Sequence, residues 1–429
     1  MNGKEQQWTA SFCDALVMVS AAVLMLVLTA SLLARAGVPF TAAYTCSILA
    51  SIIGTLLVSR GGRTLLALPS PAVTAWLVYE EIISRGTPWQ EVLGIAAAVS
   101  VLGGLLMRTK HARMLTAALP VVIRTGLVLG LGLAMLTAAA LYARILLPSP
   151  WALTMGGMLS DPLAYYTLTG ILLVLILHAM QVRCALVLGM MIIAALTWLE
   201  GFWEIPAAPF LQPDLVPAAL ALTLPQPDDF IPAALLGTIL LLTIAAESSI
   251  VLAVHADTAN AQRNQRPLTY LFGASAAAAL LGALPLCIAP VSTALPAHRE
   301  EFRLAGIPLT ACFTALLLLL LLPCAPLLEA LADFPAAPAV ALAVLGLMLL
   351  MRALTSLKNM DEPLTIREAA VVAAFALASF DVRTGLTAAL LIWVLLTAAA
   401  GQRRRIAHST WGFTALLAVL VLLQWIHKI

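Results

Sequence analysis

The sequence is built from apolar stretches, most of them near the roughly 20 residues that carry an α-helix across a bilayer. Of the 429 residues, 62% are hydrophobic and only 10% are charged. Such a chain has too few polar groups to cover a surface that faces water. We therefore expect an all-α polytopic membrane protein in contact with the lipid bilayer. The stretches fall at 12–34, 42–59, 64–84, 89–107, 114–142, 162–180, 184–200, 230–254, 268–285, 286–297, 305–331, 336–354, 366–380, 383–400 and 411–427.

The stretches form two sets of seven, with one more at the C-terminus, and an acidic, proline-rich segment lies between the sets. Because seven is odd, the second set enters the membrane with the opposite polarity. This is the inverted-repeat architecture of many secondary transporters, here with fourteen transmembrane segments. We predict a first repeat at 1–200, a periplasmic linker at 201–229, a second repeat at 230–400, and a basic loop with an extra helix at 401–429. This last helix either spans the membrane or lies on it.

The positions of Lys and Arg predict the orientation, because cationic loops resist translocation. With the N-terminus in the cytoplasm, 17 of the 23 Lys and Arg residues fall in inside loops and four in outside loops. The first apolar stretch is long enough to be a spanning helix, so we interpret it as such rather than as a signal peptide. A bacterial inner membrane is the expected location.

Several classes of function are disfavoured by what the sequence lacks. The net charge of +2 and the absence of a basic, aromatic-rich stretch do not indicate nucleic acid as a partner. The six cysteines occur singly, so neither a zinc site nor a disulfide framework is expected. Nucleotide-binding, nucleophile-elbow and metalloprotease motifs are missing. We expect no enzyme, no cofactor and no metal.

Two segments differ from the other apolar stretches because they contain several prolines among hydroxyl residues. They are LALPSPAVTAW (66–76) and LPLCIAPVSTALPAH (284–298), at matching positions of the two sets. Non-helical backbone at membrane depth survives only where protein or a water-filled cavity satisfies it, and matched interruptions mark transporter binding sites. We predict strands at 67–73 and 287–293, each followed by a half-helix. The ligand would contact these segments through backbone N–H groups and the side chains Thr74, Ser292 and Thr293. Ordinary kinked helices are the alternative.

Charged residues inside a membrane are costly and by default functional. Glu247 is the most central, in LLLTIAAESSIVLAVHAD (240–257). A buried carboxylate can exchange a proton near neutral pH and can accept hydrogen bonds from a ligand. His255 and Asp257 follow on the same helix as boundary residues, with proton exit as the second interpretation. Arg124 lies about one turn inside its span; it reaches the interface, or it pairs with an acid or an anionic substrate.

Three regions of the chain resemble the nucleobase–cation symporter-2 family, in particular its hypoxanthine, guanine and adenine permeases. Residues 36–106 resemble the second-to-fourth helix region, WALTMGGMLSDP (151–162) the approach to the sixth helix, and FDVRTGLTAALLIWVLL (380–396) the late core. The resemblance implies a core-and-gate fold that imports a nucleobase, a purine rather than a pyrimidine, with a proton or sodium ion. It places Glu247 as the acid that binds the base. The site is then lined by the backbone of Ala72, Val73, Ser292 and Thr293.

The sequence departs from the family in the tenth segment. That segment usually supplies a second acid after its hydroxyl-rich stretch, whereas residues 292–297 read STALPA. Two alternatives follow: an anion transporter of the SulP type with the same fold, for which Arg124 would be the charge partner, or a transport-inactive scaffold or sensor. The oligomeric state is open, with a homodimer as one option.

Overall fold

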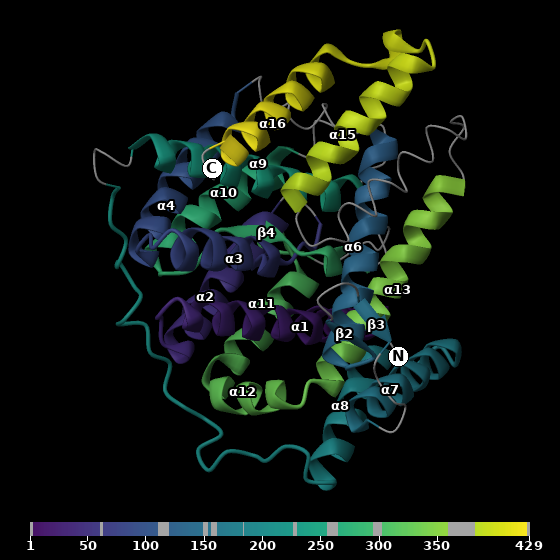
Figure 1. Ribbon diagram of the computed structural model, residues 1–429. Helices are drawn as coiled ribbons and strands as arrows, with labels where there is room; N and C mark the ends of the chain where they lie inside the picture. The colour runs from purple at the N-terminus through teal and green to yellow at the C-terminus, as the bar shows by residue number, and fades with distance from the viewer. Residues whose placement is uncertain are drawn as a thin grey trace.

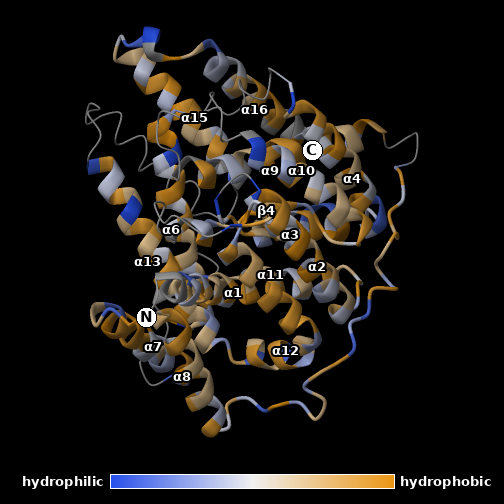
Figure 2. Ribbon diagram, turned by 180° about the vertical axis from the view of Figure 1, so that it is seen from behind, coloured by the Kyte–Doolittle hydropathy of each residue, from blue (hydrophilic) through white to orange (hydrophobic). Residues whose placement is uncertain are grey.

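The computed structural model describes residues 3–60, 63–109, 120–148, 153–155, 161–182, 184–225, 230–254, 265–294, 303–358 and 382–426. Within these ranges the chain is mostly helical, and eight helices are long and apolar enough to cross a membrane. Hydrophobic residues run along the helices, and hydrophilic residues gather mainly at helix ends and in connections (Figure 2). The prediction of a polytopic helical membrane protein is confirmed. The apolar stretch at 366–380 lies outside the described residues.

The described elements follow the apolar stretches of the sequence. They are α1 (Gly3–Arg35), α2 (Phe40–Ser59), β1 (Ala67–Pro69), α3 (Pro71–Trp76), the π-helix η1 (Leu77–Ser84), α4 (Trp89–Leu106), α6 (Val121–Tyr142), β2 (Leu146–Pro148), β3 (Leu153–Met155), α7 (Pro162–Ala179), α8 (Ala185–Leu199), α9 (Phe230–Val254), α10 (Gln265–Leu280), β4 (Leu286–Ile288), η4 (Pro290–Ala294), β5 (Arg303–Leu304), β6 (Ile307–Pro308), α11 (Leu309–Leu321), η5 (Leu322–Cys324), α12 (Ala325–Asp333), α13 (Ala336–Lys358), α15 (Val382–Ala399), η6 (Arg403–Arg405) and α16 (His408–Ile426).

Prolines determine where many of these helices begin. Pro39, Pro88, Pro120 and Pro308 immediately precede α2, α4, α6 and α11. A proline restrains its own backbone and disfavours helix in the residue before it, so each one separates a connection from a helix. Proline also corrects one expectation. The stretch 305–331 is not a single helix: it starts as a short hairpin, and Pro323 interrupts it as η5 between α11 and α12.

Eleven of the described α-helices form two groups (Figure 1). One contains α1 to α4 with α9, α10 and α11; the other contains α6, α7, α8 and α13. The packing within the first group is reciprocal. α4 packs against α9 and α10, and α11 packs against α1 and α2, while α2 and α10 pack against each other. Described helices from before and after the 201–225 segment therefore pack around a shared centre.

The crossing of α6 and α13 has the same reciprocal character and is the most extensive helix contact. Gly132 and Gly346 face each other at this crossing. A Cβ atom on Gly132 would lie 3.0 Å from the Gly346 carbonyl oxygen, and one on Gly346 would lie 2.9 Å from the Gly132 carbonyl oxygen. Glycine at both positions lets the two backbones approach closely, as small residues do in membrane helix pairs.

The segment that links the two sets is ordered along 201–225, and it is attached to the first group of helices. Its backbone N–H groups at Leu211, Leu220 and Thr223 donate hydrogen bonds to carbonyl oxygens of η5, α10 and α4, at 2.9–3.0 Å. Gly94 of α4 leaves room for the Thr223 carbonyl, which a Cβ atom would meet at 1.9 Å. The linker is thus held by backbone contacts, although its composition alone indicates only a polar connection.

Candidate functional site

The two proline-rich segments meet at the centre of the first helix group. β1 and β4 pair antiparallel, with Ala67 opposite Ile288, Leu68 opposite Cys287 and Pro69 opposite Leu286. Both strands are buried. Two strands of three residues cannot satisfy all their backbone groups through each other, so the surrounding helices must supply partners.

Hydroxyl side chains supply these partners. The N–H groups at Leu66 and Ala67 donate to Ser292 Oγ at 2.9 Å and to Thr55 Oγ1 at 3.2 Å. On the other strand, the N–H groups of Leu286 and Ile288 donate to Ser275 Oγ at 3.0 Å and to Ser248 Oγ at 3.3 Å. These oxygens come from α2, α9, α10 and η4. The buried Ser and Thr residues therefore explain how non-helical backbone is tolerated here.

The prediction of strands followed by short helices is confirmed in kind but wrong in length. We expected strands at 67–73 and 287–293; the structure has Ala67–Pro69 and Leu286–Ile288. Pro71 occupies the first position of α3, and Pro290 begins η4. The fixed φ of proline suits the first turn of a helix, so each strand ends just before its proline. Ser70, in extended conformation, is the joint between β1 and α3.

Glu247 lies on α9 beside this joint and is buried, with 6% of its surface exposed. Ser70 Oγ donates a hydrogen bond to its Oε1 at 2.9 Å. The Cys287 thiol, from the middle of β4, lies against the same carboxyl group. Oε2 has no hydrogen-bond partner among the described residues. The site thus presents a buried acceptor with one oxygen still open to a donor.

The structure describes some of the other predicted site residues beside the strand pair and leaves others undescribed. Ala72, Val73 and Thr74 lie in the first turn of α3, and the Thr74 N–H closes that turn onto the Ser70 carbonyl at 2.9 Å. The oxygen of Ser292 already accepts from Leu66. Thr293 belongs to η4, and the structure does not describe its side chain. His255 and Asp257 lie outside the described residues.

Arg124 lies in the first turn of α6 and is partly buried. Its Nε is buried and has no hydrogen-bond partner within the described part of the chain. Arg85 forms ion pairs with Glu80 and Glu81, and Arg144 forms one with Asp161. Among the described residues, no ion pair joins Arg124 to Glu247. No described group of three or more His, Cys, Asp and Glu could hold a metal ion.

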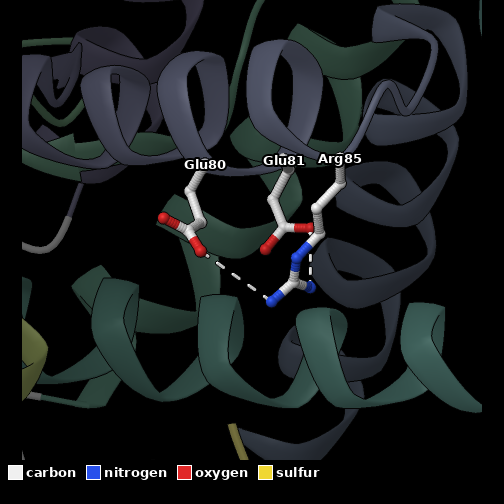
Figure 3. Close-up of polar contacts among 3 residues, drawn as sticks. All are labelled: Glu80, Glu81 and Arg85. Carbon is white, nitrogen blue, oxygen red and sulfur yellow. Dashed lines mark hydrogen bonds and ion pairs between the residues drawn. The ribbon is translucent and has the colours of Figure 1, made fainter. Parts of the chain in front are cut away.

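A charged cluster on η1 was not anticipated from the sequence. Arg85 lies 3.1 Å from Glu81 Oε2 and 3.9 Å from Glu80 Oε1, and Glu81 is buried (Figure 3). Two adjacent acids within an apolar stretch are a signal that could have identified it. The π-helix η1, which carries Glu80 and Glu81, continues directly from α3. Such π-helical turns often lie near functional sites. Ser70 and Cys287 were also missed, since nothing in the local sequence relates them to Glu247.

A cavity of about 450 Å³ lies between the two helix groups, against the second proline-rich segment. Pro290 and Val291 of η4 line it from one side. Val174 and His178 of α7 and the part of α13 up to Arg352 line it from the other. The cavity is thus bounded by the same short helix that supplies Ser292 to the strand pair.

The fold is similar to that of solved transporter membrane domains. The structure resembles the transmembrane domain of the cyanobacterial bicarbonate transporter BicA, with a TM-score of 0.55 and 18% identity over 88% of this chain and 96% of that one. It also resembles the murine anion transporter Slc26a9 in its inward-facing state, with a TM-score of 0.51 and 9% identity over 90% of this chain and 68% of that one. The chain is a multi-pass membrane protein with the architecture of transporter membrane domains.

The sequence relatives are more specific. The chain is 27% identical over 197 residues to guanine/hypoxanthine permease PbuO of Bacillus subtilis, which covers 44% of this chain and 46% of the relative. It is 24% identical over 193 residues to nucleobase transporter PlAzg2 of Paenibacillus larvae, covering 45% and 39%. The putative permease MJ0326 of Methanocaldococcus jannaschii is 27% identical, with 44% of each chain covered.

No family model matches the chain. The matched part spans less than half the length of these curated relatives. In sequence the protein is similar to nucleobase permeases, from which it has diverged, and the resemblance found in the residues is confirmed.

Proposed function

We propose that this protein imports a nucleobase, a purine rather than a pyrimidine, by symport with a proton or another cation. The observation that carries the proposal is Glu247, which lies at the meeting point of the two proline-rich segments with Oε2 open. A planar base offers ring N–H donors. A hydrogen bond from such a donor to a buried carboxylate is among the stronger polar contacts a protein can make.

The surroundings of Glu247 support an uncharged ligand with donors. The groups that contact the carboxyl group include the Ser70 hydroxyl and the Cys287 thiol, and neither side chain is a cation. The cavity of about 450 Å³ against η4 is in the size range of small-molecule sites, and it is lined by residues of α7, η4 and α13 that do not include Glu247. In this proposal the backbone of Ala72 and Val73 and the residues Thr74, Ser292 and Thr293 line the substrate.

The transport cycle requires a coupling group and a moving element. Glu247 is the proposed proton carrier, with His255 and Asp257 towards the end of the same helix. We place the fourteen segments as two inverted repeats, 1–200 and 230–400, joined by the periplasmic linker 201–229 and followed by 401–429. The N-terminus is in the cytoplasm of a bacterial inner membrane. Two features support this arrangement. α4 packs against α9 and α10 as α11 packs against α1 and α2, and Gly132 of α6 faces Gly346 of α13.

Anion transport is the competing function, and the solved structures with this fold include transporters of bicarbonate and other anions. The likeness to them concerns the fold alone. A carboxylate in the site would repel an anion unless it were protonated or paired, and Arg124 forms no ion pair with it. Charge reversal at Arg124 therefore separates the two functions: it should abolish anion transport and leave base transport mostly intact.

Uptake by proteoliposomes tests the proposal. Labelled hypoxanthine, guanine, adenine and uracil would be compared with bicarbonate and sulfate, under an imposed proton gradient and then a sodium gradient. We expect purine uptake, and an affinity about 100-fold weaker in Glu247→Gln, because a charge-assisted hydrogen bond is lost. Glu204→Gln, at an exposed position of the linker, is the matched control and should behave as wild type. Correctly inserted protein that moves none of the bases would refute the proposal.

A further inference from the structure

We propose that Cys287 determines which ligands can form a hydrogen bond with Glu247, because its thiol lies beside the carboxyl group and leaves Oε2 without a hydrogen-bond partner. The inference rests on the proposed nucleobase function and adds a positioning residue to it. Cys287 lies at the middle of β4, opposite Leu68, with 2% of its surface exposed. It interacts with both Glu247 and Ser248.

Cys287 differs from the neighbouring Ser and Thr residues because it carries a thiol where they carry hydroxyl groups. Elsewhere around the strand pair, hydroxyl side chains are the acceptors: Thr55, Ser248 and Ser275 accept from strand N–H groups, and Ser292 accepts from Leu66, the residue before β1. Next to Glu247, on the side of Ser70, a hydroxyl also donates. On the side of β4 the chain has a thiol instead.

The physical difference between these two groups is donor strength. A hydroxyl is a full hydrogen-bond donor, whereas a thiol is a weak one. Ser70 satisfies Oε1, while Oε2 has no partner that meets hydrogen-bond geometry within the described residues. A buried acceptor without a partner costs free energy, so an arriving N–H donor gains the full benefit of pairing with it. A serine at position 287 would instead place a strong donor beside the same carboxyl group and compete with the ligand.

A purely structural role for Cys287 makes a different prediction. A buried cysteine often packs as a small hydrophobic residue. In that case alanine, which leaves a void, would be the more harmful substitution, and serine, which is similar in size, the milder one. The proposed role predicts the reverse order for ligand affinity.

The test measures hypoxanthine binding to purified full-length protein. We expect Cys287→Ser to weaken binding about 10-fold while raising the unfolding midpoint of the ligand-free protein relative to Cys287→Ala, because its hydroxyl satisfies Oε2. Cys287→Ala should bind within about 3-fold of wild type. Cys324→Ser, at a buried cysteine of η5, controls for the general effect of the replacement and should leave affinity unchanged.

A second measurement needs no substitution. Methyl methanethiosulfonate would be applied to the wild-type protein with and without hypoxanthine, and modification of each cysteine followed by mass spectrometry. We expect hypoxanthine to slow modification of Cys287 several-fold and to leave that of Cys324 unchanged.

The outcomes separate the two proposals. Equal affinities of Cys287→Ser and Cys287→Ala, or a Cys287 modification rate that hypoxanthine does not alter, would overturn the role of Cys287 while the nucleobase function stands. Wild-type protein that binds no base would overturn both.

Discussion

The two proline-rich segments have the same plan but differ in what they contribute. Each has a buried strand of three residues, then a proline that starts a short helix. In the first segment, α3 continues into η1, and the Ser70 hydroxyl points to Glu247. In the second, η4 is described to Ala294, and its Ser292 hydroxyl accepts from Leu66 in the first segment.

The difference indicates that the serine residues of the two segments have separate roles. Ser70 contacts the acid of the candidate site, whereas Ser292 supports the backbone of the opposite strand. Cys287 is the contact of the second segment with Glu247. Substitutions in the two segments should therefore affect different measurable properties, and the comparison can be tested one residue at a time.

The largest effect is expected from Ser292→Ala. This substitution leaves the buried N–H of Leu66 without its acceptor, which costs about 2 kcal/mol of stability. The unfolding midpoint in detergent should fall by several degrees, while hypoxanthine affinity of the folded protein should fall less than in Ser70→Ala, because the Ser292 oxygen already accepts from Leu66. Ser100→Ala is the matched control, because that hydroxyl only donates to a carbonyl one turn back in α4. A strong loss of affinity with unchanged stability would reverse the roles assigned to the segments.

A smaller effect, on affinity, is expected from Ser70→Ala. The hydroxyl orients the Glu247 carboxylate, and its loss should weaken hypoxanthine binding about 5-fold, or about 1 kcal/mol. Stability should fall as well, because Glu247 Oε1 loses its donor, so the loss of affinity is what distinguishes this substitution from Ser292→Ala. Ser20→Ala, a hydroxyl that donates within α1, serves as control. If Ser70→Ala and Ser292→Ala behaved alike in both assays, the comparison would fail.

The smallest effect is expected from Arg85→Gln, which removes the ion pairs of η1. The pair with Glu81 is short but Arg85 is partly exposed, so we expect a loss of about 1 kcal/mol or less in thermal stability. Arg144→Gln breaks a more exposed contact of 4.0 Å with Asp161 and should have no measurable effect. If the two substitutions lowered thermal stability equally, burial of Glu81 would not strengthen its ion pair with Arg85.

Much of this architecture could be predicted because the governing constraints are local. Prolines among hydroxyls predicted both broken segments, and the central position of Glu247 in its apolar stretch predicted a buried acid, whose functional role stays a prediction. The strand lengths were wrong, since each proline begins a helix earlier than expected. The break at Pro323 was also missed, although the proline itself was a visible signal.

The partners of Glu247 could not be predicted in the same way. Ser70 is 177 positions away in the chain, and Cys287 lies on a different segment again. Neither the spacing of residues nor their composition identifies Ser292 as a support for Leu66, because that contact joins segments 226 positions apart. Such contacts depend on how the helices pack.

The sequence by itself determined that the chain resides in a membrane, approximately where its helices run, and that two proline-rich segments interrupt them. These properties follow from the transfer of apolar residues into lipid and from the backbone restrictions of proline, and both act over a few residues. Only the tertiary structure decided which hydroxyl supports a strand, which one contacts Glu247, and which carboxylate oxygen stays open. Buried backbone groups need hydrogen-bond partners, and those of the strand pair come from Thr55 on one side of the linker and from Ser248, Ser275 and Ser292 on the other.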